Sequence, residues 1–157
     1  IEGIDIAVSV VDLEDGPRAL PPVEIRTDGG DYDYAARYTT DETEYFVPAR
    51  LPEELLEALA EAAVNAHEIL GLRDLSRIDF VVDADGTCWF IDANVTPGMT
   101  DTSLFPQAAD AAGSFAELCC RLVDFVAAER PLSAASQGDP AVDEDGESSA
   151  NSSEGED

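Results

Sequence analysis

Two strand-like runs joined by a tight turn constrain this chain more than any other feature of its sequence. The runs span residues 77–83 and 87–93, and Asp85-Gly86 lies between them. An Asp-Gly pair in this position is one of the strongest signals for a two-residue β-hairpin. We therefore predict an antiparallel pair of strands whose register is set by this turn.

The register of the predicted hairpin brings four polar side chains to one face. Asp79 then lies opposite Asp92. Arg77 lies opposite Asn94 in the same register. Side chains alternate between the two faces of a strand, so these four share a face. The other face is expected to be apolar core and to hold Ile78, Phe80, Trp89 and Ile91.

The two facing carboxylates suggest a metal site. Their Cβ atoms would lie about 5 Å apart, which is destabilising unless a cation lies between them. Carboxylates beside the Asn94 amide suit Mg²⁺ or Mn²⁺, and Mg²⁺ commonly completes its coordination with waters and substrate phosphates. Arg77 would add a fixed positive charge for a reacting carboxyl or phosphoryl group. The alternative interpretation is a solvated polar face that keeps an exposed hairpin soluble.

Strands and a long helix are predicted before the hairpin. Residues 4–13 and 22–25 have strand composition, with turn signals at 14–17 between them. Pro52 in a first helical position, followed by two glutamates, predicts a helix that ends at Gly71. Its apolar stripe is expected to pack in the core and consists of Leu55, Leu59, Ala62, Ala66 and Ile69. The predicted class is α+β, an antiparallel sheet packed with helices.

The rest of the chain divides into a last helix, a loop and a tail. Ser114 and Glu117 form a capping-box pattern for the helix. Residues 26–44 are polar but contain three tyrosines, which predicts a loop that packs over another part of the protein. Residues 131–157 lack apolar periodicity and predict a disordered acidic tail. Residues 1–130 are expected to form one domain.

The charge of the chain limits its partners. It is -27, from 35 acidic and 8 basic residues, and every basic residue is Arg. Such a surface argues against nucleic acid and suggests adaptation to a salty cytoplasm, because salt screens the repulsion. No apolar run approaches the roughly 20 residues of a membrane-spanning helix, so no membrane role is expected. The start, which alternates like a strand and has no Met, is interpreted as a cut inside a longer protein.

Cysteine and histidine are not expected to form a site. Cys88, Cys119 and Cys120 contain no CxxC pair, which favours reduced, buried thiols over a disulfide or a zinc site. His67 could be proposed as a general base. Because no acid or nucleophile accompanies it in the sequence, we expect a histidine on the helix surface.

The segment after the hairpin carries a family resemblance. Residues 94–104 read Asn-Val-Thr-Pro-Gly-Met-Thr-Asp-Thr-Ser-Leu. Together with Arg-Ile-Asp-Phe at 77–80, Tyr-Asp-Tyr-Ala-Ala-Arg-Tyr at 32–38 and Glu-Tyr-Phe-Val-Pro-Ala at 44–49, this segment resembles the D-alanine-D-alanine ligases of the ATP-grasp superfamily. Several motifs in one order are more specific than any one of them. The resemblance covers roughly residues 1–129 and implies the C-terminal subdomain of the ATP-grasp fold.

The resemblance implies an ATP-dependent ligase. In that family, ATP phosphorylates the carboxylate of one D-alanine, and the amine of a second D-alanine attacks the acyl phosphate. The dipeptide enters peptidoglycan, which implies a cytoplasmic enzyme. Two Mg²⁺ or Mn²⁺ ions would bridge the ATP phosphates and would be held by Asp79, Asp92 and Asn94. Arg77 and the backbone N–H of Gly98 would stabilise the oxyanion of the tetrahedral intermediate.

Further positions implied by the resemblance would contact the substrates. Ser103 and the backbone N–H of Leu104 would receive the carboxylate of the second D-alanine. Asp5 would bond the ATP ribose, Arg37 would reach the terminal phosphate, and Tyr38 would belong to a loop that closes over the site. Family members commonly dimerise, which implies a possible homodimer at full length.

The chain departs from the family's pattern in three places. Asp92 stands where Glu is usual, which shortens the bridging ligand by one methylene, and Arg37 stands where Lys is usual. The N-terminal domain that binds the first D-alanine is expected to be missing, so the chain alone is expected to be inactive. Two alternatives stay open: a related ligase with another substrate pair, such as D-alanine and D-lactate, and a non-catalytic relative that only binds nucleotide or a protein partner.

Overall fold

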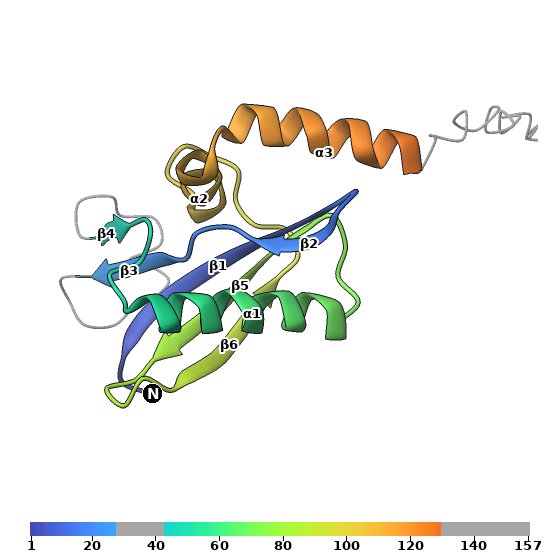
Figure 1. Cartoon of the computed structure of the whole chain (residues 1–157). Coiled ribbons are helices and arrows are strands. Elements are labelled where there is room, and N and C mark those ends of the chain that lie inside the picture. Colours follow the sequence, from blue (N-terminus) through green and yellow to red (C-terminus); the bar gives the residue numbers. More distant parts are fainter. Residues whose placement is uncertain (28–42, 130–157) are drawn as a thin grey trace, which may run out of the picture.

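The computed structural model describes residues 1–27 and 43–129, and these residues form one sheet with three helices (Figure 1). The strands are β1 (Ile4–Leu13), β2 (Gly16–Ala19), β3 (Val23–Thr27), β4 (Thr43–Phe46), β5 (Leu75–Val82) and β6 (Cys88–Asn94). The helices are α1 (Glu53–Ile69), α2 (Leu104–Ala112) and α3 (Phe115–Glu129). The sheet order is β4-β3-β1-β5-β6, with β2 paired to β1, and all of these pairings are antiparallel. The predicted α+β class is confirmed.

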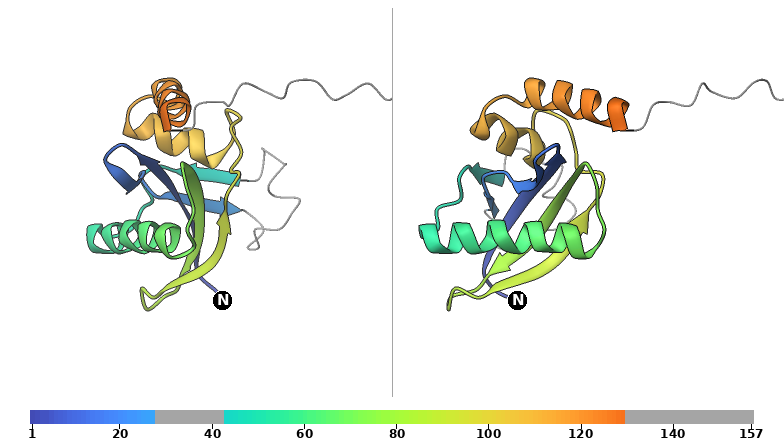
Figure 2. Two further views of the ribbon diagram at one scale, coloured as in Figure 1. Left: turned by 90° about the vertical axis from the view of Figure 1, so that its right-hand side faces the viewer. Right: turned by 45° about the vertical axis from the view of Figure 1, so that its right-hand side comes forward.

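The central strand β1 separates two cores. It pairs with β5 along one edge and with β3 and β2 along the other. Ile6, Val8 and Val10 are buried in the core that includes α1. Ala7 and Val11 are buried in the core that includes α2 and α3. The two views in Figure 2 show the resulting arrangement, with α1 and the α2–α3 pair packed on different sides of the sheet.

Helix α1 forms where its apolar periodicity predicts it, with small differences. Pro52 is the residue that precedes the first helical position, and Gly71, with φ of 64°, adopts the left-handed conformation just beyond the helix end. Left-handed backbone favours glycine because a side chain would clash there. The buried stripe follows Leu59, Ala63 and His67, four residues apart. Ile69 is 85% exposed, so its prediction as a core residue is wrong.

The hairpin confirms the predicted register next to the polar residues and departs from it near the turn. Arg77 pairs with Asn94 and Asp79 pairs with Asp92, as predicted. A bulge between Asp79 and the following residue then shifts the register by one. A bulge places one extra residue in one strand, so the faces of the residues beyond it are exchanged.

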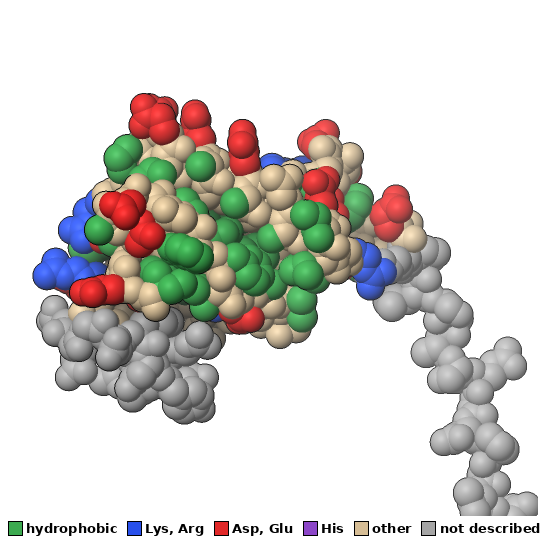
Figure 3. All heavy atoms as spheres, turned by 90° about the horizontal axis from the view of Figure 1, so that it is seen from below, with side chains coloured by type: hydrophobic (Ala, Val, Ile, Leu, Met, Phe, Trp, Pro, Cys, Tyr) green, Lys and Arg blue, Asp and Glu red, His purple; other side chains and the backbone are tan. Residues whose placement is uncertain are grey.

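Because the faces are exchanged, the predicted burial of two apolar residues of β6 is wrong. Trp89 and Ile91 were expected in the core, but they are 44% and 51% exposed. Phe90 pairs with Phe80 instead, and their rings meet edge to face with centroids 6.2 Å apart. The outer edge of β6 pairs with no described strand. Hydrophobic side chains gather on the underside of the molecule, with acidic side chains along its rim (Figure 3).

The second half of the chain contains one predicted helix and one that was missed. Helix α3 begins after Ser114, and the backbone N–H of Glu117 donates to the Ser114 hydroxyl at 3.3 Å, as in a capping box. Helix α2 was not predicted, nor was β2, which begins inside the expected turn at 14–17. The boundary at residue 130, the predicted tail 131–157 and most of the predicted loop 26–44 lie outside the described residues.

The three cysteines lie on β6 and α3 and are less buried than the sequence predicts. All three cysteines are free, as expected, but their predicted burial is wrong: Cys88 and Cys119 are half-buried and Cys120 is exposed. On α3 the buried positions are Leu118 and Leu122, and Cys120 lies between them on the outer side. Along the described part of the chain, no helix is long and apolar enough to cross a membrane.

Candidate functional site

The candidate site lies on the face of the sheet opposite α1. Arg77 and Asp79 project from β5, and Asp92 and Asn94 project from β6, directly across from them. Side chains of β1 join the same face, because Ala7 pairs with Asp79 on the other edge of β5. The structure therefore brings together residues that are separated by more than 80 positions in the chain.

An ion pair dominates this face. The Arg77 Nε and Nη2 atoms donate to the two carboxylate oxygens of Asp79 at 2.7 and 2.8 Å. The two side chains are only 11% and 18% exposed. A forked Arg–carboxylate pair combines charge with fixed geometry, and partial burial reduces its screening by solvent. The pair therefore fixes the direction of the Arg77 guanidinium, and an ion that bound Asp79 would have to share its oxygens with Arg77.

The two remaining candidate ligands differ in their surroundings. Asp92 is exposed on β6. The side-chain oxygen of Asn94 accepts a hydrogen bond of 2.9 Å from the backbone N–H of Thr96, which orients the amide. Within residues 1–27 and 43–129, no group of three or more His, Cys, Asp or Glu side chains could hold a metal ion. Mg²⁺ commonly takes only one or two protein carboxylates and completes its shell with water and phosphate, so this donor set fits such an ion.

The loop after β6 is built around a close approach between two residues. A Cβ at Gly98 would lie 2.6 Å from the Ser103 hydroxyl and 3.2 Å from the Ser103 Cβ. Any larger residue at this position would therefore displace Ser103. The Ser103 hydroxyl is held 2.8 Å from the Thr100 hydroxyl and accepts from the Thr100 backbone N–H at 3.2 Å.

Ser103 also precedes the first turn of α2, which begins at Leu104. Its side chain makes no capping hydrogen bond to that helix. The first N–H groups of a helix lack partners within the helix, and with the helix dipole they attract anions. The start of α2 can therefore receive a carboxylate next to the Ser103 hydroxyl.

The other predicted site residues divide between two parts of the chain. Asp5 lies on β1 on the same face as Ala7, so the structure places it with the β5 and β6 residues. Arg37 and Tyr38 lie outside the described residues.

One buried residue of this face was not found from the sequence. Ser9 lies opposite Arg77 on β1 and is 1% exposed, and its hydroxyl has no hydrogen-bond partner among the described residues. The alternation of side chains along β1 would have pointed to Ser9, but only if the pairing of β1 with β5 had been known.

The turn of the hairpin is fixed by Asp83 as well as by the Asp-Gly pair. The Trp89 indole N–H donates to one Asp83 oxygen at 2.8 Å, and the other oxygen accepts from the backbone N–H groups of Asp85 and Thr87. These donors, the indole first, lower the pKa of Asp83 below its usual range. The Trp89–Asp83 bond also explains why Trp89 leaves the apolar core.

A second ion pair fixes the chain between β3 and α1. Glu24 on β3 accepts from the Arg50 guanidinium at 2.6 and 3.1 Å and from the Arg50 backbone N–H at 2.9 Å. The guanidinium also lies over the Phe46 ring, 3.4 Å from its centroid. The side-chain bonds from Arg50 lower the pKa of Glu24, although burial opposes the shift. This contact positions the end of β4 next to β3.

His67 is not on the helix surface, so that prediction is wrong. It is 1% exposed, and its Nδ1 lies 2.8 Å from the Ser76 hydroxyl. Its Nε2 lies 3.8 Å from a carboxylate oxygen of Asp12. The ring joins α1 to β5 and β1 on the side of the sheet opposite Asp79. It therefore serves the packing of α1 and takes no part in the candidate site.

Comparison with known proteins gives a consistent result. The family model "D-ala D-ala ligase C-terminus" matches residues 1–124. A D-alanine--D-alanine ligase of Bordetella petrii is 46% identical over 124 residues, which are 78% of this chain and 38% of the relative. The D-alanine--D-alanine ligase of Bacillus anthracis, solved in complex with ATP, matches with a TM-score of 0.66 and 32% identity over 83% of this chain and 42% of that one.

A third relative differs in its named substrates. The VanG D-Ala:D-Ser ligase of Enterococcus faecalis matches with a TM-score of 0.66 and 27% identity, covering 80% of this chain and 36% of that one. Across these three matches the chain spans between 36% and 42% of the relative's length.

Proposed function

Because the chain belongs to the family of the D-alanine-D-alanine ligase C-terminus, we propose that it is the metal- and ATP-binding part of a ligase that joins two D-alanines. The dipeptide would serve peptidoglycan synthesis in the cytoplasm, and the full-length protein would be a homodimer. The observation that carries the proposal is the pairing of Asp79 with Asp92 beside the pairing of Arg77 with Asn94, on one face of a chain from this family.

The first step proposed is transfer of the terminal phosphoryl group of ATP to the carboxylate of one D-alanine. Asp79, Asp92 and Asn94 would hold two Mg²⁺ or Mn²⁺ ions, which when bound would neutralise charge on the ATP phosphates. Asp5 would bond the ATP ribose, and Arg37 would reach the terminal phosphate. The oxygens of Asp79 and Asn94 are already oriented by Arg77 and Thr96, which supports their role as fixed ligands.

The second step proposed is attack of the amine of a second D-alanine on the acyl phosphate. Negative charge then develops on the former carboxyl oxygen, and Arg77 with the Gly98 backbone N–H would stabilise it. The Asp79 pair holds the Arg77 guanidinium in one direction before substrate arrives, so little reorganisation is needed. Tyr38 would close over the site during this step.

The second D-alanine would be held at the start of α2. Its carboxylate would accept hydrogen bonds from the Ser103 hydroxyl and the Leu104 backbone N–H. The uncapped first turn of α2 and the fixed Ser103 side chain support this role. The carboxylate would thereby leave the amine free to react.

The experiment that tests the proposal uses this chain within a protein of the full length of its relatives. Phosphate release from ATP and Mg²⁺ should require D-alanine and yield the dipeptide, and it should fall by about a hundredfold or more in Arg77→Ala. Arg73→Ala removes the same charge from an exposed position and should leave the rate unchanged. The 157-residue chain alone should release no phosphate. D-alanine-independent release, or equal rates in the Arg77 and Arg73 variants, would contradict the proposal.

A second candidate is a ligase that joins D-alanine to another partner. The match to a D-Ala:D-Ser ligase favours it, since the identity of 27% approaches that of the dipeptide ligase structure at 32%. Product analysis with D-alanine alone, and then with added D-serine or D-lactate, separates the two candidates. Mixed product in excess over the D-alanine dipeptide would select the second.

A further inference from the structure

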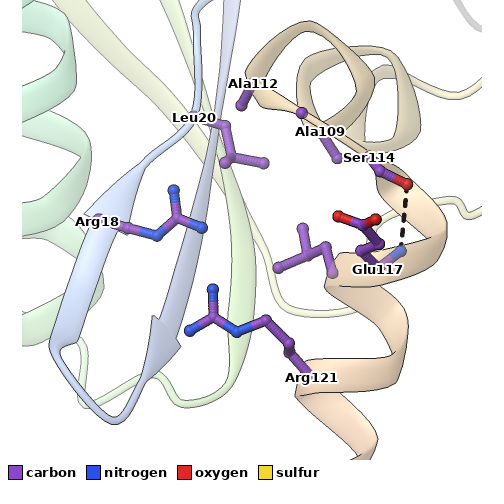
Figure 4. Close-up of a pocket in the computed structure, with 9 residues that line it drawn as sticks. Arg18, Leu20, Ala109, Ala112, Ser114, Glu117 and Arg121 are labelled. Atoms are coloured by element: carbon purple, nitrogen blue, oxygen red, sulfur yellow. Dashed lines mark hydrogen bonds between the residues drawn. The ribbon is translucent and has the colours of Figure 1, made fainter.

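A pocket separate from the candidate site lies between β2 and the junction of α2 with α3. Its volume is about 150 Å³. It is lined by the residues shown in Figure 4: Arg18, Leu20, Ala109, Ala112, Gly113, Ser114, Glu117, Leu118 and Arg121. None of the residues assigned above to metal, ATP or D-alanine lines it. Whatever binds here would bind at a second site.

The positive side of the pocket consists of Arg18 and Arg121. Figure 4 shows both guanidinium groups directed into the space between β2 and α3. Arg121 donates to Glu14 at 3.2 Å, with both side chains at least half exposed, so this pair is weak. Among the described residues Arg18 has no ion-pair partner. A chain with 35 acidic and 8 basic residues thus places two arginines together without an acid bound between them.

The negative side of the pocket is Glu117 on the first turn of α3. Figure 4 shows Glu117 and Arg121 on the same helix, with the Glu117 carboxylate closer to α3 and the two guanidinium groups closer to β2. Within the described ranges it forms no ion pair with Arg18 or Arg121. Only the backbone N–H of Glu117 takes part in the cap, so its carboxylate stays available. The pocket therefore has separate groups for an anion and for a cation.

The wall between these charged groups is apolar and small. Leu20, Ala109 and Leu118 are buried at 2%, 2% and 7% exposure. Ala112 and Gly113 add little volume, and a Cβ on Gly113 would meet nothing within 4 Å. A pocket of this volume has room for a benzene-sized molecule, and any larger ligand would lie mostly outside it.

We propose that this pocket binds a small amino acid in its zwitterionic form. The α-carboxylate lies between Arg18 and Arg121, the ammonium group faces Glu117, and a hydrogen or methyl side chain lies against Ala109 and Leu20. Arginine pairs of this kind suit a carboxylate because each guanidinium offers a fork of donors. A simple anion is disfavoured because Glu117 repels it, and a bulky side chain exceeds the space.

The proposal is tested by titration calorimetry of amino acids against the whole chain, with amide NMR to map where they bind. Glycine and both enantiomers of alanine should bind and shift the Gly113 and Leu118 amide signals. Acetate and methylammonium each lack one charged group and should bind more weakly than alanine by about tenfold at least. Leucine should not bind. Shifts confined to Gly98 and Ser103 would place the amino acid in the candidate site and overturn the proposal.

Two variants at the pocket give effects of opposite sign. Arg18→Gln should weaken alanine and acetate alike by about tenfold, whereas Glu117→Gln should weaken alanine and strengthen acetate. Arg73→Gln and Glu57→Gln make the same charge changes at exposed positions elsewhere and should alter neither ligand. The proposal is overturned if alanine binds no better than acetate, or if Glu117→Gln strengthens both. It is equally overturned if the pocket and control variants behave alike.

Discussion

The two faces of the sheet differ in the side chains that β1 and β5 direct toward them. On the α1 face, Ile6, Val8 and Ile78 are almost fully buried among other apolar side chains. On the other face, the same strands carry the buried Arg77 and the partly buried Asp79. The α1 face depends on apolar volume, whereas the other face combines the apolar core under α2 and α3 with the paired charges of β5. Substitutions on the α1 face should therefore change stability, whereas those on the other face should also change ligand binding.

The largest stability effect is expected at Leu59 on α1, whose side chain is 0% exposed. Leu59→Ala should lower the free energy of unfolding by about 2–5 kcal/mol, because it removes apolar contacts and leaves a cavity. Urea unfolding measures this loss. Metal binding by the folded fraction should not change. A change in metal affinity as large as the change in stability would mean that the two faces are not separable.

A smaller stability effect and a larger functional one are expected at Arg77. Arg77→Ala should destabilise the chain by about 1–3 kcal/mol, because Asp79 loses its forked partner in a partly buried position. It should also raise the affinity of this chain for Mn²⁺, since the Asp79 oxygens no longer accept from Arg77. Titration with Mn²⁺ checks the second effect. A fall in affinity would show that Arg77 orients Asp79 for the metal without competing for it.

Gly98→Ala should mainly affect the loop before α2. The added Cβ would lie within 2.6 Å of the Ser103 hydroxyl, so Ser103 must move and its bonds to Thr100 weaken. We expect a loss of about 1–2 kcal/mol in unfolding free energy. Within a protein of the relatives' full length, the apparent affinity for the proposed second D-alanine should fall as well. Thr96→Ala changes the same loop without crowding Ser103 and serves as its control.

The smallest effect expected is a pH dependence from Glu24. Arg50 lowers the pKa of Glu24 below its ordinary value of 4.5, so the carboxylate contributes stability above that pH. This contribution should be lost as the pH falls below 4.5 through the lowered pKa of the folded state. Comparing acid unfolding of the native chain with that of Glu24→Gln isolates it. Glu44→Gln breaks the exposed pair with Arg26 and a weaker charge interaction with Arg50, and it should change the acid transition less than Glu24→Gln does.

The sequence allowed the register of the candidate site's strands to be predicted better than the packing around them. The pairing of Asp79 with Asp92 followed from one turn and the period of a strand. The bulge did not follow, because the period of a strand carries no signal for the register shift after Asp79.

Two further features needed contacts between distant segments. His67 is buried because Ser76, on another element, supplies a partner for its ring. Helix α2 has only nine residues, and it was missed although Ser103, a residue type favoured at helix starts, precedes it. Local patterns therefore predicted elements and register, whereas tertiary contacts decided which polar and apolar side chains are buried.

The central claim is that the face with Asp79 and Asp92 binds a divalent ion. Paramagnetic broadening of amide NMR signals during a Mn²⁺ titration tests it most directly. Signals of residues 92–98 should broaden before those of α1, and Asp79→Asn or Asp92→Asn should each remove this preference. Asp124→Asn makes the same charge change on α3 and should preserve it. Broadening that follows acidic residues across the surface, and that is unchanged in both site variants, would contradict the account.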